Sequence, residues 1–181
     1  EERVSLPAGG QIAPGTQFHV EDDFRAANDY HLLPLGLSYT RRSGPWRLNL
    51  GGNIAIGFMR QEVEVRGRTT TSVGEIAQET YDAGLLALAS NRGDHQRYLF
   101  AWSPELTLNL ERRLPQGWSL YAGYSVLYLS DVARAPDHVD TTIDPNLIPP
   151  ALASDGVRPA FSFRSSGEWL HGMNLGIGRR F

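Results

Sequence analysis

Strict alternation of apolar with small or polar residues is the feature that most constrains what this chain can fold into. From Trp46 to Phe58, apolar side chains occupy nearly every second position, and Arg, Asn, Ala and Gly stand between them. Side chains of a β-strand point alternately to opposite faces, so this segment is expected to be a strand with one apolar and one polar face. Helical periodicity is nearly absent. The sequence therefore predicts an all-β protein.

Six segments alternate in this way, some more clearly than others, and we expect each to be a strand. They are residues 16–27, 31–41, 46–58, 98–111, 118–130 and 169–181. Residues 1–15 are expected to be irregular, and residues 16–181 to form a meander of antiparallel strands. Short polar turns are expected at 28–31, 42–45 and 113–117, because these segments are brief and two of them carry the Gly and Pro that tight turns use.

Two long polar segments, at about 66–97 and 131–166, are expected to be loops. Following the strands up and down from the last one, both long loops and the 28–31 turn fall at one rim. The other two turns fall at the opposite rim together with Phe181. Short turns at one rim and long loops at the other are typical of outer-membrane barrels, in which the long loops are extracellular.

Alternation by itself does not say whether the apolar face meets a protein core or lipid, because soluble barrels of the lipocalin kind alternate too. Strand length favours lipid: Trp118 to Tyr128 is roughly 33 Å of extended chain. With a tilt of about 40° this strand spans roughly 25 Å, the height of the apolar band of a membrane barrel. Strands of soluble sandwiches are usually shorter.

Aromatic residues concentrate near both ends of the expected strands, as in the two girdles at the surfaces of a membrane. The expected girdle residues are Tyr39, Trp46, Phe58, Tyr98, Phe100, Trp102, Trp118, Tyr128 and Phe181. The opposite face combines many glycines with polar side chains, which suits a barrel lumen. The expected lumen-lining residues are Arg47, Asn49, Asn53, Glu105, Thr107, Asn109, Glu111, Ser119, Ser125, Asn174 and Arg180.

The last strand has an apolar residue at alternate positions and ends on an aromatic. Met173, Leu175, Ile177 and Phe181 form this row, and we expect it to face lipid and to act as the signal read by the barrel-assembly machinery. Arg179 interrupts the row, and its long side chain is expected to reach the membrane edge.

Composition removes several classes of protein. There is no cysteine, so disulfides and thiolate metal sites are excluded. The net charge is −3 and no run of basic residues occurs, so nucleic acid is not an expected partner. No stretch of 18 apolar residues is present, which excludes a transmembrane helix but not a spanning barrel. We expect no cofactor.

The long loops contain acidic and histidine residues that deserve a chemical test. Asp131, Asp137, His138, Asp140 and Asp144 lie in one loop, and Asp94 and His95 in the other. Oxygen-rich loops suit calcium, and an Asp/His pair can activate water. The spacing matches neither an EF-hand loop nor a two-histidine metal motif, so the favoured interpretation is solvated loop charge and no enzymatic activity.

Three features are specific enough to compare with known families: the Gly-Tyr-Ser…Leu-Tyr-x-Ser run at 123–130, Asp140 in the loop after it, and the ending from Trp169 to Phe181. With them, residues 18–181 resemble the putative beta-barrel porin-7 family of bacterial outer-membrane proteins. Departures are Leu32-Leu33-Pro34 where the family has Gly-Gly-Gln, Leu129 in place of a tryptophan, and Pro136 in place of a glycine. The resemblance implies an outer-membrane barrel with a pore role, no catalytic residue, and further strands preceding Glu1.

The resulting hypothesis is an outer-membrane β-barrel that acts as a passive channel for small polar solutes or as a structural wall. Six strands cannot close a membrane barrel, so other strands, from the same protein or from other subunits, are expected to complete it. Two alternatives stay open: a soluble lipocalin-like barrel that binds a small ligand, and an outer-membrane enzyme with an Asp/His site in its loops.

Overall fold

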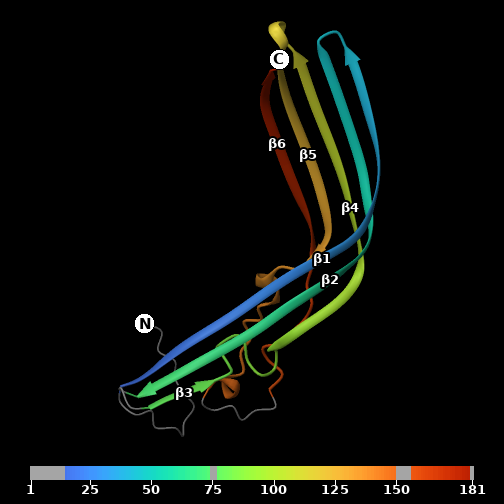
Figure 1. Ribbon diagram of the computed structural model, residues 1–181. Coiled ribbons are helices and arrows are strands. Elements are labelled where there is room, and N and C mark those ends of the chain that lie inside the picture. The colour runs from blue at the N-terminus through green and yellow to red at the C-terminus, as the bar shows by residue number, and fades with distance from the viewer. Residues whose placement is uncertain (1–14, 74–76, 150–155, 180–181) are drawn as a thin grey trace. The chain divides into compact units, whose positions relative to one another are not determined.

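The computed structural model describes residues 15–73, 77–149 and 156–179, and in this part of the chain all regular structure is strand or short 3-10 helix. The strands form one sheet in the order β1-β2-β4-β5-β6, with β3 paired to the end of β2 (Figure 1). The bounds are β1 Thr16–Ser43, β2 Trp46–Val73, β3 Ala77–Tyr81, β4 Gly93–Arg113, β5 Trp118–Val132 and β6 Ser166–Arg179. The 3-10 helices are η1 Pro115–Gly117, η2 Ala135–His138 and η3 Pro145–Leu147. The prediction of an all-β antiparallel sheet is confirmed.

The chain divides into two compact units, and the long strands contribute to both. Unit 1 comprises residues 1–27, 62–96 and 133–164, and unit 2 comprises residues 28–61, 97–132 and 165–181. Unit 2 is a sheet of five strand segments joined by the two tight turns. Unit 1 contains the ends of β1, β2 and β4 opposite those turns, together with β3 and the long connections.

One predicted turn is wrong: residues 28–31 are part of β1, which runs without interruption from Thr16 to Ser43. This segment has no Gly or Pro to reverse the chain, and two of its polar side chains form hydrogen bonds within the sheet. Asn28 accepts a hydrogen bond of 3.0 Å from Gln61 on β2, and the Tyr30 hydroxyl donates to the carbonyl of Ser130 at 2.7 Å. Two predicted strands are therefore one.

The predicted loop at 66–97 begins too early, because β2 continues to Val73 and then forms a hairpin with β3. Beyond Phe58 the alternation persists, but charged residues replace apolar ones on one face while Val63 and Val65 on the other face are buried. Residues 66–73 are therefore polar but belong to a strand, not to the predicted loop. A strand with a solvated face needs no apolar residues on that face.

The turns of unit 2 have the backbone geometry that their residues predict. Gly44 has φ +55°, and Gln116 and Gly117 have φ of 61° and 80°. Glycine adopts positive φ at little cost, which accounts for Gly44 and Gly117. At the opposite end, β5 ends in a bulge between Leu129 and Val132, where Asp131 has φ 56°. A bulge redirects the strand, and here it starts the long connection to β6.

Unit 1 has a hydrophobic core in which the long connections pack on the strands. Val63, Val65 and Ala87 are fully buried and contact Phe161 and Phe163, among others. A second cluster joins Ala83, Leu88 and Leu147. The connection after β3 is tied to β1 by Asp22, whose carboxylate accepts hydrogen bonds from the backbone N–H groups of Leu85, Leu86 and Ala87 at 2.8–3.2 Å. These connections are thus folded onto the strands.

Candidate functional site: the two faces of unit 2

Side-chain pairs fix how β1, β2 and β4 align in unit 2. Arg47 on β2 pairs with Glu111 on β4. Asn53, six residues later on β2, pairs with Glu105, six residues earlier on β4, so the two strands are antiparallel and in constant register. The same antiparallel register places Phe58 opposite Phe100. On the other side of β2, Thr40 donates a hydrogen bond of 2.9 Å to Asn49 on the same principle. Polar residues therefore align with polar residues, and apolar residues with apolar residues, in rows across the sheet.

The polar face continues across β4, β5 and β6. In one row Thr107 aligns with Ser125 and Ser125 with Gly172; in the next, Asn109 aligns with Gly123 and Gly123 with Asn174. In a third row Glu111 aligns with Tyr121 and Tyr121 with Gly176. Toward the bulge the same face turns apolar, as Leu127 aligns with Leu170. We call the three rows the polar grid.

The structure brings the predicted lumen residues together on this one face, as far as they are described. The ten described members are Arg47, Asn49, Asn53, Glu105, Thr107, Asn109, Glu111, Ser119, Ser125 and Asn174. Arg180 lies outside the described residues. Both of their carboxylates have partners: Arg47 lies 3.3 Å from Glu111, and Glu105 accepts a hydrogen bond of 2.8 Å from the neutral amide of Asn53.

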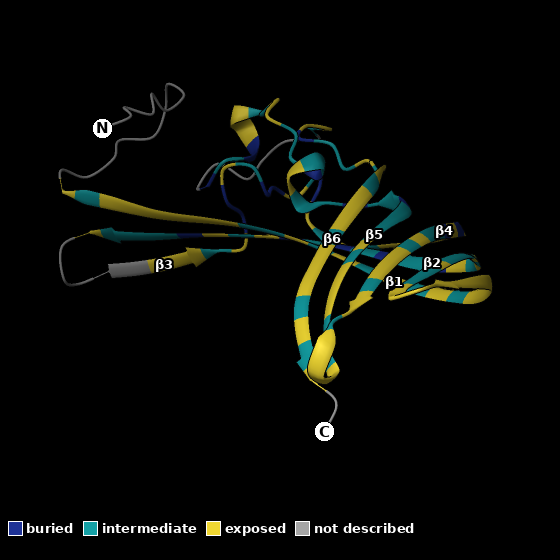
Figure 2. Cartoon of the chain, turned by 90° about the horizontal axis from the view of Figure 1, so that it is seen from above, coloured by how far each residue is buried: buried dark blue, intermediate teal, exposed yellow. Residues whose placement is uncertain are grey.

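The other face of unit 2 is apolar and exposed. Leu37 is 88% exposed, Met173 79% and Leu175 77%, and exposed apolar residues of the other strands extend this face across the sheet. Figure 2 shows β6 exposed over most of its length, and its half-buried residues (Glu168, Gly172, Gly176 and Gly178) all lie at even positions, on the opposite face from Met173 and Leu175. Contiguous apolar surface of this extent marks a binding face for protein or membrane. We call it the apolar belt.

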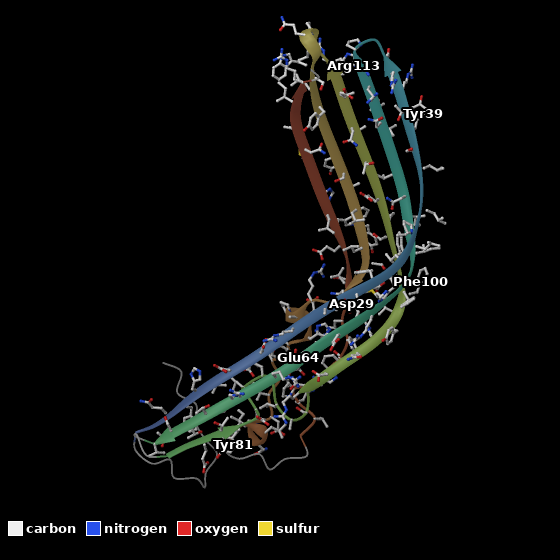
Figure 3. All side chains as sticks on the ribbon, viewed as in Figure 1. Asp29, Tyr39, Glu64, Tyr81, Phe100 and Arg113 are labelled. Carbon is white, nitrogen blue, oxygen red and sulfur yellow. The ribbon has the colours of Figure 1, made fainter. Side chains whose placement is uncertain are left out.

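Aromatic residues stand at both ends of the apolar belt. Tyr39 lies toward the turn end of β1, and Phe100 lies toward the other end of unit 2 on β4 (Figure 3). Among the predicted girdle residues, Tyr39, Trp46, Phe58, Tyr98, Phe100 and Trp102 are exposed, Trp118 and Tyr128 are half-buried, and Phe181 lies outside the described residues. Of the predicted terminal row, Met173, Leu175 and Ile177 are exposed on this belt.

Two features at the ends of the apolar belt were not predicted from the sequence. Trp169 is 62% exposed and its ring lies 4.9 Å from that of Tyr128, which also contacts Trp102 at 5.1 Å. Its place in the alternating series of the last strand could have identified it. At the turn end, Arg112 lies over the ring of Trp46 at 5.1 Å, and Arg179 lies over Trp118 at 5.3 Å.

The acidic and histidine residues of the loops do not form one site. Asp94 pairs with Arg66 at 2.8 Å, Asp144 accepts from the N–H of Asn146 at 3.0 Å, and Asp137 lies 3.9 Å from Arg134. Among the residues that the structure describes, no group of three His, Asp or Glu residues could hold a metal ion.

His138 corrects the interpretation of these residues as solvated loop charge, because it is only 3% exposed. Its Nδ1 lies 2.8 Å from the carbonyl oxygen of Arg134, and the backbone N–H of Arg164 donates to its Nε2 at 3.3 Å. The ring also stacks on Phe161, whose centroid is 5.7 Å away and which His95 contacts at 3.5 Å. Both histidines are therefore part of the packing of unit 1.

Asp140 organises the connection between β5 and β6. It accepts hydrogen bonds from the N–H groups of Thr142 and Ala160, both at 2.9 Å, and from the Arg158 guanidinium at 2.7 Å. The backbone donor of Ala160 contributes most, and together these donors hold the pKa of Asp140 well below its usual range. Asp140 therefore has a structural role, whereas the sequence analysis predicted a solvated loop charge.

A buried polar network at the end of unit 2 was not foreseen. Gln61 is fully buried; its Oε1 accepts from Nε of Arg97 at 2.7 Å, and its Nε2 donates to Asn28 and to the carbonyl of Asp131. Arg97 also donates to the hydroxyl of Ser165 at 2.8 Å. Gln61 occupies an alternate position ahead of Val63 and Val65, which is the one signal of burial in the sequence.

An antiparallel sheet with an exposed apolar belt on one face and a polar, glycine-rich grid on the other defines a β-barrel protein of the porin type. Among the described residues, no helix has the length and apolar character needed to cross a bilayer. The chain belongs to the family described as putative beta barrel porin-7, whose model matches residues 1–181. Neither the curated proteins nor the solved structures contain a significant match to the chain.

Proposed function

We propose that this chain forms part of the wall of a β-barrel in the bacterial outer membrane, and that the barrel is a passive channel for small polar solutes. The observation that carries the proposal is the contrast between the two faces of unit 2. A soluble lipocalin-like barrel would bury its apolar face around a ligand. In unit 2 the apolar face is exposed along its strands, and the polar residues align with one another across the strands.

The height of the apolar belt supports lipid as its partner. Along β2, Trp46 marks the turn end and Phe58 the other end, a separation of roughly 40 Å of strand at about 3.3 Å per residue. A tilt of about 40° reduces this to roughly 30 Å, the thickness of the hydrocarbon core of a bilayer. Aromatic rings then stand at both interfaces, where amphipathic rings are favoured.

The arginine–tryptophan pairs support the same boundary. Arg112 and Arg179 are on the apolar face, where a charge at mid-bilayer would be costly. Both lie over tryptophan rings at the turn end of the strands, so each guanidinium can extend to the headgroups while its aliphatic stem and the ring remain in the apolar layer. A protein-binding patch has no need of such an ordered edge.

The polar face supports a water-filled lumen with weak charge selectivity. Its two carboxylates in the described rows each have a neutralising or hydrogen-bonding partner, Arg47 for Glu111 and Asn53 for Glu105. Fixed unpaired charges would select ions by sign, whereas paired charges and amides select weakly. Small neutral or zwitterionic solutes are the expected cargo.

The membrane orientation follows from the connections. The tight turns at Gly44 and at η1 face the periplasm in this proposal, and the long connections at about 66–97 and 131–166 are extracellular. β1 and β6 are the edge strands of the described sheet. Unpaired edges are not tolerated in lipid, so strands from elsewhere in the protein or from other copies close the barrel.

The terminal row contributes to insertion. Met173, Leu175 and Ile177 present exposed apolar side chains at alternate positions of β6, and we propose that this row, with Phe181, is read by the barrel-assembly machinery. The loop residues offer no support for catalysis, since His138 contacts backbone groups rather than a carboxylate.

Two measurements on the full-length protein test the proposal. Membrane fractionation should recover it with the outer membrane, and extraction should require detergent. In planar bilayers it should produce discrete conductance steps with a reversal potential near zero in a salt gradient. A protein that stays soluble without detergent would reject the membrane wall, and a well-inserted barrel without conductance would reject the channel.

A further inference from the structure

We propose that the polar grid contains a binding site for an uncharged polyhydroxylated solute of about monosaccharide size. This inference rests on the proposed function, because it names the solute class for the same lumen. It starts from a hollow of about 320 Å³ in unit 2, lined on the polar face by Thr107, Asn109, Ser125 and Asn174 among others. A volume at the low end of the usual range for ligand sites suits a small solute.

Glycine forms the floor of the hollow. Gly123 is flanked by Asn109 on β4 and Asn174 on β6, and both amide oxygens occupy the space where a side chain at Gly123 would begin. Two amide groups from different strands thus converge over one glycine. Beside them, a Cβ at Gly172 would lie 2.7 Å from the hydroxyl oxygen of Ser125, so Gly172 leaves that hydroxyl open to the hollow.

The polar groups of the hollow have unused hydrogen-bonding capacity. Within the described residues, the side chains of Asn109 and Asn174 make no hydrogen bond to another protein group, and neither do those of Thr107 and Ser125. Two amides and two hydroxyls supply both donors and acceptors. Such a mixture matches alcohol groups, each of which is a donor and an acceptor.

The electrostatics of the hollow disfavour anions as its ligand. Glu105, the one carboxylate that lines it, already accepts from the amide of Asn53 at 2.8 Å. Glu111 in the neighbouring row is paired with Arg47. An anion would find no cation among the lining residues and would be repelled by Glu105, whose charge the neutral amide of Asn53 does not cancel. The remaining groups are neutral, so the ligand that they fit is neutral too.

Tyr121 adds an aromatic surface in the adjoining row. Its ring covers Gly176 on β6, and it is 46% exposed on the polar face. One side of the ring therefore packs on the glycine while the other side is open. The C–H face of a sugar ring can pack on such a surface while its hydroxyls reach the amides. Amides, hydroxyls and an aromatic ring next to one another are the chemistry of sugar recognition.

The test uses the full-length protein in two ways. In planar bilayers, the monosaccharide D-glucose is titrated against the ion current, and a binding site predicts block that saturates. In detergent, saturation-transfer difference NMR with D-glucose detects binding whether or not the pore conducts. Asn174→Ala removes one hydrogen-bonding group and should raise the half-blocking concentration about fivefold. Tyr121→Phe should leave it within about twofold, and Tyr121→Ala should raise it about tenfold.

Leu120→Val is the matched control, because Leu120 precedes Tyr121 on β5 and lies on the apolar belt. If Tyr121→Ala does not fold, as judged by heat-modifiable gel mobility, Asn109→Ala takes its place with an expected fivefold effect. Block that never saturates, no NMR signal with glucose, or equal effects of Asn174→Ala and Leu120→Val would overturn the site. Absent conductance with a persistent NMR signal would overturn the channel but support the site.

Discussion

Replacing adjacent residues of β6 by arginine separates the two faces of unit 2 more sharply than any other change. Leu175 is 77% exposed on the apolar belt, and Asn174 is its neighbour on the polar face. Leu175 aligns with Ala122, between the Arg179–Trp118 pair at the turn end and Trp169 toward the other end. Leu175→Arg therefore places a charge near the middle of the belt.

The expected free-energy cost of Leu175→Arg depends on how deep in the bilayer the new arginine lies. An arginine on the lipid face at the midplane of a barrel costs about 2–4 kcal/mol, and the cost falls to about 0–1 near the interfaces. Snorkelling cannot rescue Leu175→Arg, because the boundary at Arg179 is roughly 13 Å of strand away. Asn174→Arg puts the same charge on the polar face, in the row next to Glu111, where water or that carboxylate receives it.

The assay is folding into lipid vesicles, followed by gel mobility and by urea titration of the folded fraction. A loss of 2–4 kcal/mol corresponds to a 30- to 1,000-fold shift of the folding equilibrium, roughly, so Leu175→Arg should fold poorly where the parent chain folds fully. Asn174→Arg should fold as the parent does. Equal defects in the two variants would refute the assignment of faces. A defect in Asn174→Arg alone would reverse it.

Three further predictions concern charges. Arg47→Ala leaves Glu111 without its partner, so the channel should become cation-selective. The reversal potential in a salt gradient measures this selectivity, and an unchanged potential would place the pair outside the conducting path. Asp140→Asn should speed proteolysis of the connection between β5 and β6, and in the parent the protection should persist from neutral pH down to about pH 4 and be lost below it. The sign follows from the lowered pKa of Asp140: the unfolded chain takes up the proton first as the pH falls, so stability declines only in acid, and protection lost above pH 5 would contradict this. Asp22→Ala removes the acceptor for Leu86 and Ala87 and should raise amide hydrogen exchange there but not in β6; uniform exchange would contradict the contact.

The faces of unit 2 could be predicted because a strand encodes them with a period of two residues. Whether a residue such as Asn174 or Leu175 lies on one face or the other follows from parity alone. The register of β1 with β2 and of β4 with β5 also follows once the turns are located, whereas the register across β2–β4 and β5–β6, which long connections join, does not. Parity did not reveal that β1 continues through residues 28–31 or that β2 extends into unit 1, because the prediction of a strand required apolar residues on one face.

The packing of unit 1 could not be predicted for a different reason. Phe161, Phe163 and Leu147 lie in connections with no regular period, so nothing in their spacing indicates which partners they meet. His138 shows the difficulty most clearly. A histidine among aspartates has the composition of a solvated loop, and its burial depends on Phe161, which is distant in the sequence. Burial of this kind arises from tertiary contacts alone.

The glycines of the polar face have a physical reason that joins these observations. Glycine weakens a strand, so repeated glycine on one face needs a compensating contact. Gly176 lies under the Tyr121 ring, and Gly123 lies between two asparagine side chains. In each case a larger neighbour from the adjacent strand fills the space that the glycine leaves. The polar face is thus built from cross-strand pairs of a small and a large residue, and the large members present the amides and the aromatic ring to the lumen.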